Sequence, residues 1–110
     1  MRVLVCGGRE YSDWGQMRWV LGAIRIDTVI TGAARGADSV AGEWATDQGV
    51  DLVTYPANWE RDGKSAGFKR NQLMLDNAKP DLVVAFPGGN GTAHMVRIAK
   101  EAGVPVLRVE

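Results

Sequence analysis

The chain has 110 residues, 45% of them hydrophobic and 24% charged, which is the size and composition of one ordinary soluble domain. Its 13 basic and 13 acidic residues give a formal net charge of +0, which disfavours binding of nucleic acid or membranes by bulk charge. A single cysteine excludes an internal disulfide, and no apolar run reaches the ~20 residues of a membrane helix, so we expect a cytoplasmic protein.

Short apolar runs alternate with helical patterns along the chain. We predict strands at residues 2–6, 28–31, 51–55, 81–86 and 104–109. The first run ends at Gly7 and is too short for a signal peptide. Four helices are predicted between the strands, with inward-facing residues Met17, Val20, Leu21 and Ile24; Val40, Ala41, Trp44 and Ala45; Leu73, Met74 and Asn77; and Met95, Ile98, Ala99 and Ala102.

Local signals mark the boundaries of these helices. Ser12 or Asp13 can cap the first helix, and Gly49 ends the second. The third is expected from about residue 66 to 77, after an irregular loop at residues 57–65 that is the longest in the chain. Strands that alternate with helices predict an α/β fold, in which a mostly parallel sheet of about five strands lies between two layers of helices in one domain, residues 1–110.

Three glycine-rich loops follow predicted strands, at Gly7–Gly8, Gly32–Gly36 and Gly88–Gly91. The carboxyl ends of parallel strands meet at one edge of the sheet, where such folds bind ligands. In the last loop a strand leads through Pro87, glycines and Thr92 into a helix, whose free N–H groups favour an anion such as a phosphate. The sequence therefore predicts a phosphate-binding site built on these loops.

Side chains near the loops complete the candidate site. Arg9 and Arg70 suit bidentate contact with phosphate. Asp38 is either a helix cap or an acceptor for a sugar hydroxyl, and Trp59 either stacks on a base or belongs to a solvated lid. The candidate ligand-binding residues are Gly7, Gly8, Arg9, Gly32, Arg35, Gly36, Asp38, Trp59, Lys64, Arg70, Asn71, Pro87, Gly88, Gly89, Asn90, Gly91 and Thr92.

Three other features of the sequence do not indicate a catalytic or metal-binding site. Gly63-Lys64-Ser65 is not a Walker A loop, because Asn58 stands where that motif needs a glycine. Cys6 is interpreted as a small buried hydrophobe and not as a nucleophile. His94 lacks partners at ligand spacing and is expected on a helix surface, so we predict no metal site and no cofactor.

Four segments of the chain resemble the YspA-type, or DUF2493, branch of the SLOG superfamily. They are Val5–Asp13, Thr31–Ala45, Asn58–Asn71 and Phe86–Ala93. That superfamily also contains the LOG proteins and the Rossmann-like domain of DprA. The resemblance implies a Rossmann-like, three-layer domain with strand order 3-2-1-4-5, which binds a nucleotide or nucleotide-derived ligand at the loops named above.

LOG enzymes are phosphoribohydrolases that release the base from N6-substituted adenosine monophosphates, and their signature is P-G-G-x-G-T-x-x-E. Residues 87–92 fit this signature, but Met95 stands at the glutamate position. Arg70 matches a catalytic arginine of these enzymes, whereas Asn71 replaces their lysine. Cleavage of an N-glycosidic bond needs a carboxylate to stabilise the developing positive charge, which Met95 cannot supply.

The favoured hypothesis is therefore binding or sensing of a nucleotide-derived small molecule, as the resemblance implies. A LOG-like hydrolase is the alternative, with Arg70 catalytic and the carboxylate drawn from Asp38, Glu43 or Glu10. DprA-like binding of single-stranded DNA is a second alternative, which the net charge disfavours. A homo-oligomer is expected, because LOG-type sites are usually completed across a dimer.

Overall fold

The computed structural model describes residues 1–110 and contains a five-stranded sheet in the order β3-β2-β1-β4-β5, with every strand pair parallel. The α/β fold, the parallel sheet and the strand order predicted from the sequence are confirmed. Two strands span the expected residues, β1 (Arg2–Cys6) and β2 (Thr28–Thr31). The other three are slightly shorter than expected: β3 (Asp51–Thr54), β4 (Leu82–Ala85) and β5 (Val106–Arg108).

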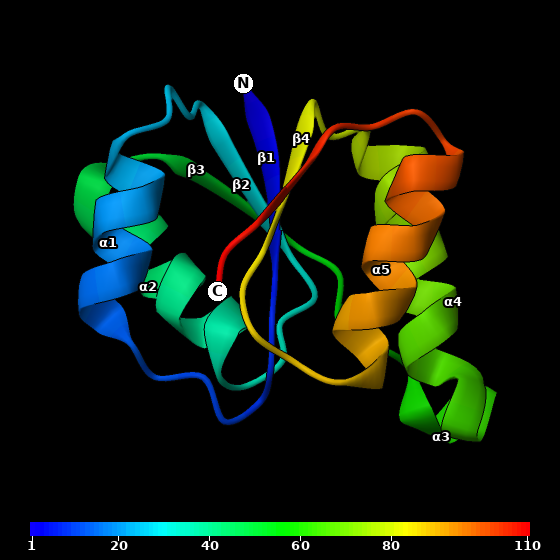
Figure 1. Ribbon diagram of the computed structural model, residues 1–110. Coiled ribbons are helices and arrows are strands. Elements are labelled where there is room, and N and C mark those ends of the chain that lie inside the picture. The colour runs from blue at the N-terminus through cyan, green and yellow to red at the C-terminus, as the bar shows by residue number, and fades with distance from the viewer.

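Helices cover both faces of the sheet (Figure 1). α1 (Trp14–Gly22) and α2 (Ala37–Gln48) lie on one face, and α4 (Ala66–Leu73) and α5 (Asn90–Glu101) lie on the other. The short helix α3 (Trp59–Asp62) and the 3₁₀ turn η1 (Gly63–Ser65) precede α4, and the π-helical turn η2 (Met74–Ala78) follows it. α3 lies at the same end of the molecule as the loops that follow β1 and β4.

Two hydrophobic clusters bury the two faces of the sheet. Val3 and Val5 of β1 point toward α1 and α2, whereas Leu4 and Cys6 point toward η2 and α5, as the two-residue period of a strand requires. All four side chains are buried, because β1 is the central strand and helices cover both of its faces.

Two expectations for residues 57–77 are wrong. The stretch expected as irregular contains α3, which begins where the Asn58 side chain accepts a hydrogen bond from the Arg61 N–H at 3.0 Å. The next helix changes to a π-helical turn at Met74. Leu73 and Asn77, which were expected to face inward, are exposed, and Leu75 is buried with Met74.

The other helices differ from the sequence pattern only at their ends. Of the two candidate caps, Asp13 begins α1, and its Oδ1 accepts a hydrogen bond from the Gln16 N–H at 3.0 Å. Ile24 lies beyond the end of α1 but still packs against the core. Ala102, expected to face inward, is the exposed C-cap of α5.

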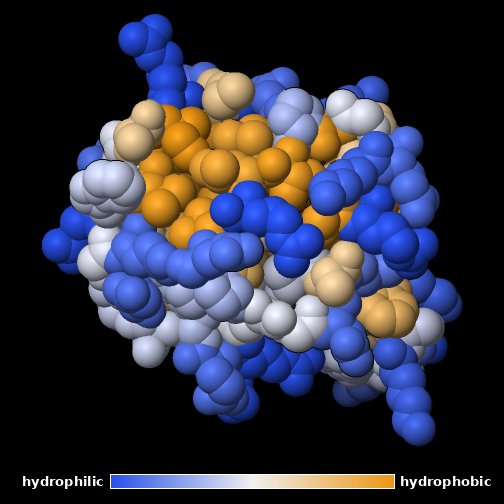
Figure 2. Space-filling model, viewed as in Figure 1, coloured by the Kyte–Doolittle hydropathy of each residue, from blue (hydrophilic) through white to orange (hydrophobic).

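One of the two edge strands of the sheet, opposite β3, is β5. Figure 2 shows apolar side chains gathered over this strand, and Leu107 is 42% exposed. The predicted homo-oligomer stays a prediction.

No helix is long and apolar enough to span a bilayer.

Candidate functional site

The three glycine-rich loops meet at the carboxyl end of the sheet, where backbone hydrogen bonds join them. The Gly8 N–H donates to the carbonyl of Pro87 at 2.8 Å, and the Gly8 carbonyl accepts from the Ala37 N–H at 3.1 Å. Gly8 thus ties the loop after β1 to the start of α2 and to the loop before α5. Its N–H is therefore occupied within the protein and does not face a ligand.

Two of the predicted glycines allow this close packing. A Cβ at Gly36 would collide with the Gly8 carbonyl oxygen, and a Cβ at Gly88 would lie 2.7 Å from the Gly8 nitrogen. Gly36 also has a φ of 79°, which favours glycine. Gly36, Pro87 and Gly88 do not line the pocket described next, so the structure places them in its supporting framework.

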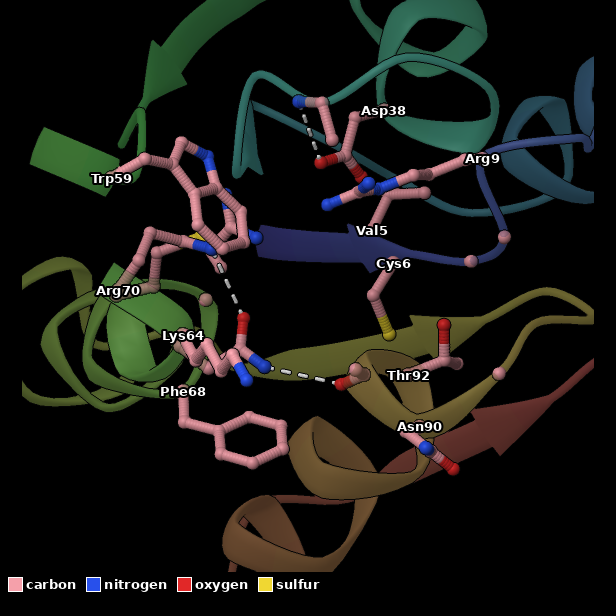
Figure 3. Close-up of a pocket in the computed structure, with 18 residues that line it drawn as sticks. Val5, Cys6, Arg9, Asp38, Trp59, Lys64, Phe68, Arg70, Asn90 and Thr92 are labelled. Atoms are coloured by element: carbon pink, nitrogen blue, oxygen red, sulfur yellow. Dashed lines mark hydrogen bonds between the residues drawn. The ribbon is translucent and has the colours of Figure 1, made fainter. Parts of the chain in front are cut away.

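A pocket of about 410 Å³ opens beside these loops (Figure 3). Trp59, Lys64 and Arg70 reach it from the α3–α4 segment. Asn90 and Thr92 reach it from the start of α5, on the opposite side. The predicted residues that line it are Gly7, Gly8, Arg9, Asp38, Trp59, Lys64, Arg70, Asn71, Gly89, Asn90, Gly91 and Thr92. Gly32 and Arg35 lie outside it, in an adjacent pocket.

The start of α5 forms the end of the pocket best suited to an anion. The first hydrogen bond of the helix joins the Ala93 N–H to the Gly89 carbonyl at 3.0 Å, and no side chain caps the helix. The N–H groups of Asn90, Gly91 and Thr92 therefore have no acceptor within the helix. The helix dipole adds partial positive charge at the same place. A Cβ built on Gly89 meets no atom within 4 Å, so space is open beside these donors.

Arg70 is held in place by the ends of two strands. Its Nη1 donates to the carbonyl oxygens of Gly32 and Tyr55, and its Nε donates to the Asn71 side chain at 3.2 Å. A Cβ on Gly32 would force the guanidinium of Arg70 out of this position. Burial lowers the pKa of Arg70, and the negative charge of Asp38 opposes this shift. The Nη2 group makes no hydrogen bond within the protein and can reach a ligand.

Asp38 organises the loop after β2. Its Oδ2 accepts hydrogen bonds from the N–H groups of Gly32 at 3.1 Å and Ala34 at 3.2 Å. It is therefore not the N-cap of α2, a position that Gly36 holds. Its Oδ1 accepts no hydrogen bond within the protein, and the residue lines the pocket. Burial raises the pKa of Asp38, opposed by these hydrogen bonds and by Arg70.

Asn71 links α4 to the start of α5. Its Nδ2 donates to the Gly91 carbonyl at 3.1 Å and lies 3.2 Å from Nδ1 of His94. The His94 ring stacks on Phe68, with the ring centroids 4.4 Å apart. Sequence reasoning missed both rings: His94 is half-buried, and Phe68 lines the pocket. The three-residue spacing of Phe68 and Asn71 on one helix face was an available signal for Phe68 alone.

His94 should make stability depend on pH. Burial lowers the pKa of His94, and the charge of Arg97 lowers it further. The folded state therefore disfavours the protonated ring, and the stability present above the unfolded-state pKa of about 6.5 is lost as the pH falls below it. We expect urea unfolding to show a lower free energy at pH 5.5 than at pH 7.5. His94→Asn, which can keep an acceptor near Asn71, should reduce this dependence, and an unchanged dependence would contradict the assignment.

Two residues considered for chemistry are buried in the core. Burial raises the pKa of the Cys6 thiol to about 12, so it is not a thiolate at neutral pH. Met95, at the position of the LOG glutamate, is fully buried and does not line the pocket.

The structure separates the three carboxylates that could replace that glutamate. Glu10 pairs with Arg35 at 2.7 Å on the surface, and Glu43 is exposed outside the pocket. Asp38 is the one carboxylate that lines the pocket. No group of three or more His, Cys, Asp or Glu side chains is arranged to hold a metal ion.

Comparisons with known proteins agree with this architecture. The Gene 61 protein of Mycobacterium phage D29 is 37% identical over 118 aligned residues, which cover 96% of this chain and 94% of that protein. The model of the YspA, cpYpsA-related SLOG family matches residues 1–61, more than half of the chain, including the first two glycine-rich loops and Trp59. The resemblance noted from the sequence is confirmed, and family membership suggests a nucleotide-related function in general. The chain belongs to the YspA, cpYpsA-related SLOG family.

Proposed function

We propose that this protein binds a nucleotide or nucleotide-derived ligand in the pocket at the start of α5, and that it acts as a binding or sensing module. The observation that carries this proposal is the meeting of uncapped α5 N–H groups with Lys64, Arg70 and Trp59 around one pocket. The helix end and the cations suit a phosphate. Trp59, which is 51% exposed, offers a surface on which a base can stack.

A thermal-shift screen tests the proposal. The panel contains AMP, ADP-ribose, NAD, cyclic nucleotides and N6-modified AMP, and each ligand that binds is recovered and analysed by chromatography. A ligand present at 100 times its Kd adds ~2.7 kcal/mol to the free energy of unfolding, which is readily detected in a domain of this size. We expect a shift with the ligand recovered intact. The absence of a shift with every nucleotide would contradict the proposal.

The Oδ1 of Asp38, which accepts no hydrogen bond within the protein, favours a LOG-like phosphoribohydrolase as a second candidate. In that case Asp38 would stabilise positive charge that develops on the ribose, and Arg70 would hold the phosphate. Free base would appear in the recovered ligand, and Asp38→Asn would abolish its release. Intact ligand after long incubation would eliminate this candidate.

Arg70→Ala is expected to weaken nucleotide binding by about 1–3 kcal/mol, because a charge-assisted contact with phosphate is lost. The substitution also frees the Gly32 and Tyr55 carbonyls, so stability must be measured beside affinity. Isothermal titration gives the affinity and urea unfolding gives the stability. Lys69→Ala is a suitable control, because the exposed Lys69 points to Asp62 and does not line the pocket. Equal affinities of the two variants would remove Arg70 from the site.

A further inference from the structure

A second pocket of about 450 Å³ lies next to the first. The two share Arg9, Ala34, Trp59 and Arg70 as lining residues. The Arg9 guanidinium lies 5.7 Å from the centre of the Trp59 ring, so these two side chains stand at the boundary between the pockets. Both volumes lie in the range of small-ligand sites. A ligand that passes Trp59 can therefore occupy both.

The lining of the second pocket is basic. Arg9, Arg35 and Arg70 line it, and no acidic residue does. Arg35 pairs with Glu10, but both side chains are largely exposed, and such pairs are weak and easily exchanged for a stronger anion. Arg9 makes no hydrogen bond or ion pair, so its guanidinium is free to bind. Three guanidinium groups around one hollow suit a phosphate group.

The floor of the second pocket has an unusual backbone. Ala33 has a φ of 59°, a left-handed conformation that residues with a Cβ rarely adopt. The bonds of Asp38 to the N–H groups of Gly32 and Ala34 hold this conformation from both sides. Strained backbone of this kind gathers at binding sites.

We propose that the ligand is a nucleotide with a second phosphate-bearing part, as in a 5′-phosphorylated dinucleotide, and that this second part occupies the arginine-lined pocket beyond Trp59. The inference rests on the proposed function, because it extends the ligand of the first pocket. The first phosphate binds at the start of α5, Trp59 packs against the middle of the ligand, and Arg35 contacts the second phosphate.

The test compares the affinities of AMP and the dinucleotide pApA by isothermal titration at physiological ionic strength. We expect pApA to bind about tenfold more tightly or better, the gain from one charge-assisted contact. Arg35→Gln, which alters only the second pocket, should bring the ratio of the two affinities close to one. The matched variant Lys64→Gln alters only the first pocket. It should lower the affinities for AMP and pApA by the same factor, so that their ratio is preserved.

The other outcomes distinguish a failure of the second site from a failure of the proposed function. Equal affinities for AMP and pApA, or a ratio that Arg35→Gln leaves unchanged, would overturn the second site and leave the proposed function standing. No binding of either ligand would overturn both. Affinity that keeps rising with a longer single-stranded oligonucleotide would overturn the small-molecule assignment in favour of nucleic acid.

Discussion

Gly89→Val is expected to abolish nucleotide binding while the protein stays folded. Gly89 lines the pocket, and a Cβ built on it meets no atom of the protein within 4 Å. Its φ of −102° lies outside the left-handed region, so valine imposes no left-handed strain. The branched side chain instead fills the space beside the α5 N–H groups. Loss of a charge-assisted anion contact there corresponds to about a hundredfold weaker binding or more.

Gly22→Val is the matched control for this variant. Gly22 ends α1 and does not line the pocket, and a Cβ built on it also meets no atom within 4 Å. Titration of both variants with the best ligand of the nucleotide panel gives their affinities, and circular dichroism checks the fold. Gly22→Val should bind as the unmodified protein does. Normal binding by Gly89→Val would show that the loop before α5 is not the phosphate site.

Gly36→Ala should cause the largest loss of stability among the glycine substitutions. The residue has a φ of 79°, and a Cβ there would collide with the Gly8 carbonyl oxygen and lie 2.6 Å from the Arg9 carbonyl oxygen. Backbone strain and the enforced movement of the neighbouring loop both oppose the folded state. Together they are expected to lower the free energy of unfolding by about 3 kcal/mol or more, as measured by urea unfolding.

Gly49→Ala separates the two causes of this loss. Gly49 has a φ of 69° at the end of α2, but a Cβ there meets no atom within 4 Å. Strain alone should cost about 1–2 kcal/mol at this position. A loss at Gly36 that does not exceed the loss at Gly49 would contradict the packing of the loop after β2 against Gly8.

The fold could be predicted because its signals are local and repeated. Apolar runs that end in glycine indicated the strands, and their alternation with helical patterns indicated the parallel sheet. The π-helical turn at Met74 could not be predicted, because it depends on how α4 packs against the sheet and α5. A short helix such as α3 also gives too few residues for a periodic pattern, although Asn58 was a usable capping signal.

The site was predictable only in outline. The glycine-rich loops indicated where a ligand would bind, because parallel strands carry their loops to one edge. Distances between the loops decide which glycines face the pocket and which allow close packing. Gly88 and Gly89 are adjacent in sequence, yet a Cβ on Gly88 would collide with Gly8, whereas a Cβ on Gly89 would meet no atom within 4 Å. The stacking of His94 on Phe68 joins two helices that lie far apart in sequence, so no local pattern could reveal it.

The most direct test of a phosphate site at the start of α5 is a titration followed by ¹⁵N chemical shifts of the backbone amides. The best ligand of the nucleotide panel is added to the labelled protein. We expect saturable shifts of the Asn90, Gly91 and Thr92 amides, whose N–H groups would donate to the phosphate, and no comparable shift at Gly49 or Gly103. Saturable shifts confined to other parts of the chain would contradict this expectation.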